Sequence, residues 1–207
     1  MGITVSSVGT ATGIPNTLEI DVGVSVLADN VAEASAAAAK GGQAVIAALT
    51  SGGVAETDMT TTEYTIQQEY DYSGNQQRLI GYHVGNTVRA KVREVGRAGE
   101  IVDAVSAAGG DHSRIRGLRF GVEDETALEA AAREDAWNEA LAKATQLAEL
   151  SGQTLGKATA IRETVRSPVV PVRMLADTAM AEGAPTPIQP GTSTVTVDLE
   201  VEFAFER

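Results

Sequence analysis

Apolar and polar residues alternate along three long stretches of the chain. These stretches cover 18–26, 80–92 and 195–205. Because successive side chains of a β-strand point to opposite faces, a period of two predicts strands with one buried and one solvated face. Such strands are typical of antiparallel or mixed sheets, since a parallel sheet is covered on both faces.

Weaker strand patterns occupy four further segments, at 3–9, 59–72, 113–122 and 155–166. In the third segment, Ile115 is out of phase with Leu118 and Phe120. A β-bulge near Gly117 would return these apolar residues to one face. The sequence Tyr-Ser-Gly-Asn-Gln at 72–76 lies between two strand patterns and predicts a hairpin turn.

Three stretches carry the periodicity and end signals of helices. The first follows Asn30, a residue type that caps helix starts, and ends at Gly52; the others cover 97–108 and 124–150. The buried stripe of the first helix is predicted to contain Val31, Ala34, Ala38, Val45, Ile46 and Leu49. The longest helix is predicted to pack on a row of small residues, flanked by the larger Trp137, Leu141 and Leu147. That row is Leu128, Ala132, Ala136, Ala140, Ala144 and Ala148.

These elements predict an α+β fold, with a mainly antiparallel sheet and helices packed on one face, in the order β-βαβ-βαβ-αββ. We expect a single domain over 1–207, in which 17–72 and 78–122 are two βαβ units of similar shape. Five of the six prolines lie in a loop at about 168–190. This loop is either a connector without regular structure or an arm that docks a partner.

Composition excludes several classes of function. The 207 residues carry a formal net charge of -12, which disfavours nucleic-acid and anionic-membrane binding. The absence of cysteine excludes disulfides, thiolate metal sites and cysteine nucleophiles. No apolar run approaches the roughly 20 residues of a membrane span. No signal-peptide pattern follows Met1, so we expect that a leader was removed before this residue.

No motif for a cofactor, a metal or a catalytic set emerges from the sequence. Phosphate-binding loops and the nucleophile elbow are absent, and His83 and His112 lack the spacing of metal ligands. His83 is interpreted as a residue of a solvated strand face. The acidic run 123–125 fits helix capping better than acid–base catalysis.

Charges of opposite sign on the strand faces form the candidate interaction surface. Arg89, Lys91 and Arg93 follow one another on one strand, whereas Asp198, Glu200 and other acidic residues follow other strands. The two interpretations are a solvated outer face and a homo-oligomer in which acidic strands of one subunit meet basic strands of another. The apolar residues Met174, Leu175 and Met180 of the Pro-rich loop are added as candidate contacts.

The order of several short motifs resembles the SIMPL domain family, also called DUF541, from residue 5 to residue 205. The motifs include Val-Gly-Thr-Ala at 8–11, Leu-Ile-Gly-Tyr-His-Val at 79–84, and the alanine-rich helix that leads to Gly152. The resemblance implies an exported bacterial envelope protein, periplasmic or lipid-anchored in its precursor, and often self-associating. Family members include periplasmic immunogenic proteins and are linked to stress tolerance and host recognition. The resemblance supplies no catalytic residues and no cofactor.

We therefore expect a non-catalytic envelope protein that acts through self-assembly or through an envelope or host protein partner. Two alternatives come from other classes of function. One is a small-ligand-binding protein with a pocket between helices and sheet, and the other is a hydrolase with a dispersed Ser/His/Asp site.

Overall fold

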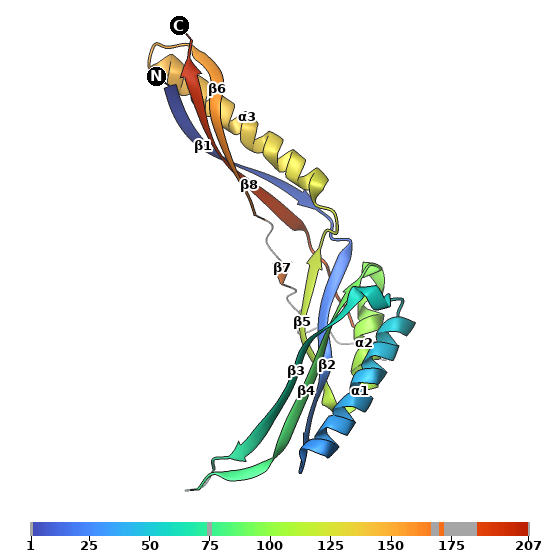
Figure 1. Ribbon diagram of the computed structural model, residues 1–207. Helices are drawn as coiled ribbons and strands as arrows, with labels where there is room; N and C mark the ends of the chain where they lie inside the picture. Colours follow the sequence, from blue (N-terminus) through green and yellow to red (C-terminus); the bar gives the residue numbers. More distant parts are fainter. Residues whose placement is uncertain (1, 74–75, 167–169, 172–185, 207) are drawn as a thin grey trace. The chain divides into compact units, whose positions relative to one another are not determined.

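The computed structural model in Figure 1 describes residues 2–73, 76–166, 170–171 and 186–206. Its antiparallel strands and helices confirm the predicted α+β class. The main elements are β1 (Gly2–Gly13), β2 (Thr17–Ala28), α1 (Val31–Ser51), β3 (Met59–Asp71), β4 (Arg78–Val92), α2 (Ala98–Gly109), β5 (Ser113–Gly121), α3 (Thr126–Leu150), β6 (Leu155–Arg166), β7 (Val170–Pro171) and β8 (Ser193–Phe205). Of the helices in these residues, none is long and apolar enough to cross a membrane.

The chain divides into two compact units, each with its own sheet and core. Unit 1 draws its described residues from Met1–Pro15, Val122–Val170 and Gly191–Arg207, and unit 2 from Asn16–Gly121 and Pro171–Pro190. The structure thus has two sheets where the sequence suggested one, because alternation shows which residues face a core but not which strands pair. That 1–207 forms a single domain stays a prediction.

Unit 2 contains both predicted βαβ units, interleaved in one sheet. Its strand order is β3-β4-β2-β5-β7, and the β3–β4, β4–β2 and β2–β5 pairs are all antiparallel. The strand β2 is therefore parallel to β3 with β4 between them, and β4 is parallel to β5 with β2 between them. Two such split βαβ units form the ferredoxin-like topology. The helices α1 and α2 lie on the same side of this sheet (Figure 1).

The helix α1 starts and ends as predicted, but its buried stripe is narrower. The Asn30 side chain accepts a hydrogen bond from the amide of Glu33, and Gly52 caps the carboxyl end. Val31 and Ile46, predicted to be buried, are each 38% exposed. The physical reason is that α1 packs mainly over β2 and β4. The stripe that is buried consists of Ala34, Ala38, Gly42, Val45 and Leu49.

The β2–β5 pair contains the predicted β-bulge. The register shifts between Asp21, which lies opposite Gly117, and Val22, which lies opposite Ile115. The extra residue, Arg116, lets Ile115 join the same core as Leu118. The prediction from the broken alternation is confirmed.

Unit 1 is built on close contact between α3 and the strand β1. Its sheet has the order β1-β8-β6, and α3 packs mainly over β1 and β8. The alanines at 132, 136, 140, 144 and 148 are at most 1% exposed, as the four-residue spacing predicted. A Cβ atom on Gly9 would lie 2.0 Å from the carbonyl oxygen of Ala132 and 2.2 Å from the amide nitrogen of Ala136. Small residues on both elements therefore set the distance between helix and sheet.

The larger residues of α3 lie beside the alanine row. The Trp137 ring is partly buried and packs at 5.9 Å, centroid to centroid, on the Phe203 ring. Leu141 and Leu147, predicted to fill the core, are 39% and 45% exposed. The prediction was wrong for these two leucines, because the helix is too close to the sheet for bulky residues to enter between them.

Substitution of Gly9 by Ala is expected to destabilise unit 1 by about 3 kcal/mol, since the new methyl group overlaps backbone atoms that cannot move independently. Thermal or urea unfolding would measure the loss. Gly96→Ala is the matched control, because a Cβ atom at Gly96 meets no atom within 4 Å. Equal stability of the two variants would contradict the close approach.

Candidate interaction surface

An ion cluster occupies the face of the unit 2 sheet that lies opposite the helices. Asp21 on β2 has a side chain only 10% exposed and lies between Arg89 on β4 and Arg119 on β5. The Nε atom of Arg89 donates to Oδ1 of Asp21 at 2.8 Å, and Nη1 of Arg119 donates to Oδ2 at 2.8 Å. The hydrogen bond from Arg89 is the largest cause that lowers the pKa of Asp21; burial opposes it, and Arg119 lowers the pKa further.

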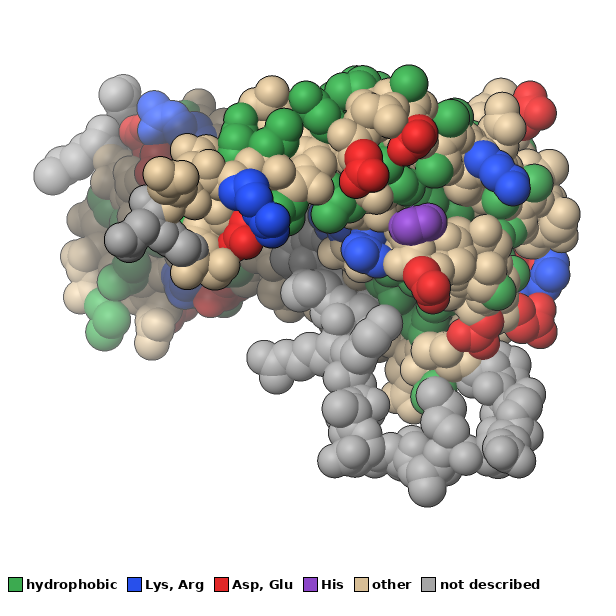
Figure 2. All heavy atoms as spheres, turned by 90° about the horizontal axis from the view of Figure 1, so that it is seen from below, with side chains coloured by type: hydrophobic (Ala, Val, Ile, Leu, Met, Phe, Trp, Pro, Cys, Tyr) green, Lys and Arg blue, Asp and Glu red, His purple; other side chains and the backbone are tan. Residues whose placement is uncertain are grey.

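The candidate basic residues at the end of β4 and directly after it lie beside acidic residues of the same chain. Arg89 binds Asp21, and the guanidinium of Arg93 donates to Asp58 at 2.8 Å. Lys91 lies opposite Glu19 in the β2–β4 register. The face of the molecule in Figure 2 accordingly shows basic side chains interspersed with acidic ones. A role of these three residues in contacts between subunits stays a prediction, and Met174, Leu175 and Met180 lie outside the described residues.

The same pairing within the chain occurs in unit 1. The guanidinium of Arg162 on β6 forms an ion pair with Glu200 on β8, and Arg166 pairs with Asp198 at 2.8 Å. Acidic and basic strands therefore meet inside one sheet, and the contact between strands of different subunits that the sequence suggested stays a prediction. The cross-strand register brings these charges together, and each exposed pair contributes little to stability.

His83, interpreted from the sequence as a residue of a solvated strand face, forms a close contact with another side chain of the same sheet. Its Nε2 atom lies 2.5 Å from the Oγ atom of Ser25 on the neighbouring strand β2. Within the described ranges, no hydrogen bond joins His83 to a carboxylate, and no three metal-ligating side chains gather. A dispersed hydrolase site requires a serine, a histidine and a carboxylate. The described residues bring together a serine and a histidine, Ser25 and His83, without the carboxylate. His112 lies in the turn Gly110–His112 before β5.

The free edge of β1 is closed by side chains of α3. The carboxylates of Asp135 and Glu139 accept hydrogen bonds from the backbone amides of Thr10 and Val8, at 3.0 and 2.9 Å. The Nζ atom of Lys143 donates to the carbonyl oxygen of Ser6 at 3.0 Å. These three helix residues are spaced by four, so they lie on one side of α3. They satisfy three of the backbone groups that an added strand would need, in the middle of β1.

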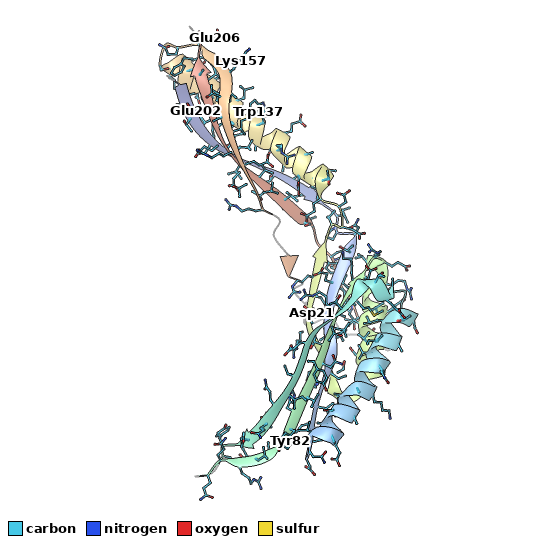
Figure 3. The ribbon with its side chains drawn as sticks, viewed as in Figure 1. Asp21, Tyr82, Trp137, Lys157, Glu202 and Glu206 are labelled. Carbon is cyan, nitrogen blue, oxygen red and sulfur yellow. The ribbon has the colours of Figure 1, made fainter. Side chains whose placement is uncertain are left out.

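At the opposite edge of the unit 1 sheet, no described strand pairs with the outer side of β6. Within the described residues, β6 pairs with β8 alone, and α3 barely reaches it. A groove of about 500 Å³ separates β6 from α3 and is lined by Trp137, Ile161 and Leu199, among others. Trp137, labelled in Figure 3, belongs to the α3 side of this groove. The Arg133–Glu163 ion pair, at 2.7 Å, crosses from the helix to the strand.

Unit 2 has an equivalent open edge at β3. In the part of the chain that the structure describes, β3 pairs only with β4. A smaller groove of about 170 Å³ lies between α1 and β3, lined by Ile46, Met59 and Val88, among others. Both units therefore leave one edge strand largely outside the cover of their helices, with an apolar groove beside β6 and a groove of mixed polarity beside β3.

Sequence reasoning missed both the closed edge of β1 and the open edges of β6 and β3. The signal for the closed edge was present, because Asp135, Glu139 and Lys143 recur at a spacing of four on a helix whose other face is alanine. The open edges had no such signal, since strand order comes from pairing between segments far apart in the chain.

Comparison with known proteins identifies the family of this chain. The family model described as "SIMPL: Protein of unknown function (DUF541)" matches residues 3–203. The chain belongs to the SIMPL family. It is 28% identical to the 26 kDa periplasmic immunogenic protein of Brucella melitensis, over 99% of this chain and 84% of that protein. It is 26% identical to the uncharacterized protein YggE of Escherichia coli K12, over 99% of this chain and 82% of that protein. The SIMPL match covers both compact units.

Replacement of Asp21 by Asn in this SIMPL protein is expected to destabilise unit 2 by about 1–2 kcal/mol at neutral pH, since two guanidinium groups lose a charged acceptor. Because the folded-state pKa of Asp21 is lowered, its contribution is fully present above the unfolded-state value of about 3.9 and is lost as pH falls through the folded-state pKa. The unfolding free energies of wild type and Asp21→Asn, measured with urea, should therefore converge as pH falls through the lowered folded-state pKa of Asp21. A difference that does not change with pH would contradict the assignment.

Proposed function

We propose that this SIMPL protein is a non-catalytic protein of the bacterial envelope that acts by assembling with copies of itself. The envelope location is supported by the name of the Brucella melitensis relative, which is called periplasmic. Binding of an envelope or host protein, and roles in stress tolerance or host recognition, enter the proposal through the family resemblance alone.

The main support for the proposal is that the backbone groups of one sheet edge are bound by side chains, whereas those of two other edges are not paired by any described element. At β1 the backbone groups of Ser6, Val8 and Thr10 are bound by α3 side chains. At β3 and β6, strands of 13 and 12 residues, no other described element pairs with the outer edge. Proteins commonly block exposed strand edges because an open edge recruits further strands. A chain that blocks the β1 edge and leaves the long β3 and β6 edges without a pairing strand among its described residues fits a molecule that pairs through them.

The net charge of -12 limits how such copies can meet. Copies of an acidic protein repel one another at long range, so association needs local contacts that outweigh the repulsion. Apolar side chains at the open edges supply such contacts. Added salt screens the general repulsion and also weakens individual ion pairs, so the salt response reports which of the two dominates.

A small-ligand-binding protein is the alternative with a specific observation behind it. The groove of about 500 Å³ beside β6 is within the size range of ligand pockets. It is lined partly by charged side chains, including Arg133, Glu134 and Glu163. A screen of small apolar compounds by thermal shift tests this alternative, because a bound ligand raises the unfolding temperature.

Self-assembly predicts a mass well above 21.4 kDa in solution. Light scattering coupled to gel filtration, at several protein concentrations and at low and high salt, would measure it. We expect oligomers that dissociate on dilution. A monomer under all conditions would refute the proposed function.

A further inference from the structure

We propose that the copies join by strand addition, with β3 of one copy pairing along β6 of the next. This inference rests on the proposed self-assembly and names the two surfaces that perform it. An extended segment that adds to a sheet edge forms backbone hydrogen bonds along its length, and its alternate side chains enter pockets beside the edge. The two strands have nearly equal lengths, 12 and 13 residues, and neither contains proline.

Both strands carry apolar side chains that their own helices leave uncovered. On β6, Ile161 is 56% exposed, although its neighbour across the sheet, Val201, is fully buried beneath α3. On β3, Ile66 is 47% exposed, although it lies opposite the buried Val84. These side chains point to the helix side of each sheet, but α3 and α1 lie mainly over other strands. The apolar side chains on the edge strand of each unit therefore lie beyond the cover of its helices.

Pairing of the two strands would complete both layers at once. A strand added to β6 lies about 4.8 Å away, so its helix-side residues would lie beside the groove that contains Trp137. Ile66 and Tyr64, which is 54% exposed, would reach this groove. In return, Ile161 and Val165 would lie beside the groove that contains Ile46 and Met59. The four exposed side chains would become one apolar layer between α3 of one copy and α1 of the next.

Charges on the opposite face favour this pairing over the two symmetric ones. On β6, Arg162 and Arg166 have side chains 82% and 66% exposed. On β3, the acidic residues Glu63 and Glu69 occupy that face, and Glu63 forms an ion pair with Arg116 of its own chain that could be shared. Like charges on neighbouring strands are destabilising, so β6–β6 and β3–β3 pairs are disfavoured and β3–β6 pairs are favoured. The present partners of these arginines, Glu200 and Asp198, are held in exposed ion pairs that contribute little and can share their arginine.

The contact is heterologous, because each copy offers two different surfaces. Repetition of such a contact produces a ring where the rotation closes and a filament where it does not. The side chains of α3 at the β1 edge hinder strand addition there, and β7 pairs along part of the outer edge of β5. The proposed contact uses the β3 edge of one copy and the β6 edge of the next.

A complementation experiment tests the pairing. Ile161→Lys inactivates the β6 edge and Ile66→Lys the β3 edge, since a charged residue in an edge row blocks strand addition. Both positions are exposed, so each variant is expected to fold, which circular dichroism would verify. We expect each variant alone to remain a monomer of 21.4 kDa and an equal mixture to form a dimer, because one intact β3 and one intact β6 are then present.

Leu150→Lys is the matched control, since Leu150 is 78% exposed at the end of α3 and belongs to neither edge strand. It should assemble as the wild type does. If the wild type assembles and both edge variants assemble equally well, the β3–β6 pairing is overturned and self-assembly stands. If the wild type is a monomer, the proposed function itself fails.

Cross-linking gives an independent readout, because the chain contains no cysteine. Thr164→Cys on β6 is mixed with Thr65→Cys or Gln67→Cys on β3, all on the face opposite the helices. Under mild oxidation we expect a disulfide-linked dimer between the β6 variant and at least one β3 variant. Thr145→Cys on the exposed side of α3 is the control. Dimers of Thr164→Cys with itself, or cross-linking equal to the control, would contradict the pairing.

Discussion

The helices of this SIMPL protein cover only part of each sheet, and most of its other features depend on that limit. In unit 1 the cause is the alanine row of α3, which lets the helix lie against Gly9 of β1 but gives it a narrow contact face. In unit 2, α1 packs mainly over β2 and β4. A helix close to a sheet stabilises the strands beneath it through tight packing and leaves the next strand with uncovered apolar side chains. The uncovered apolar side chains on β6 and β3 are the direct consequence.

Charged side chains of opposite sign pair with one another within each sheet. The cross-strand registers place Asp21 between Arg89 and Arg119, and place Glu200 beside Arg162. Such pairs balance acidic and basic side chains locally on the solvated sheet faces, while the net charge of the whole chain stays strongly negative. The general acidity favours solubility, and the balanced faces leave the apolar edges as the places where attraction can exceed repulsion. This division of roles fits the proposed self-assembly better than a general basic or acidic docking surface would.

Membership of the SIMPL family covers both units, so any account of the family's fold has to include two sheets. The split βαβ topology of unit 2 explains why helices lie on only one side of its sheet, since both crossovers run over the same face. Unit 1 is completed by strands from the two ends of the chain, β1 and β8, which pair along 12 residues of register. Its α3 serves two purposes, because the alanine side packs on the sheet and the charged side at 135, 139 and 143 closes the edge of β1.

Local patterns in the sequence determined where the strands and helices lie, including the Asn30 cap and the bulge that returns Ile115 to the core. These features depend on neighbours a few residues apart, and periodicity records them. The sequence also placed Arg89 and Asp21 on solvated strand faces, but only the tertiary structure decided that they bind each other. Strand order, the offset of each helix from its edge strand, and the exposure of Ile161 and Ile66 likewise depend on contacts between segments far apart in the chain. Such contacts leave no periodic signal, because a strand with one uncovered face has the same alternation whether its edge is open or paired.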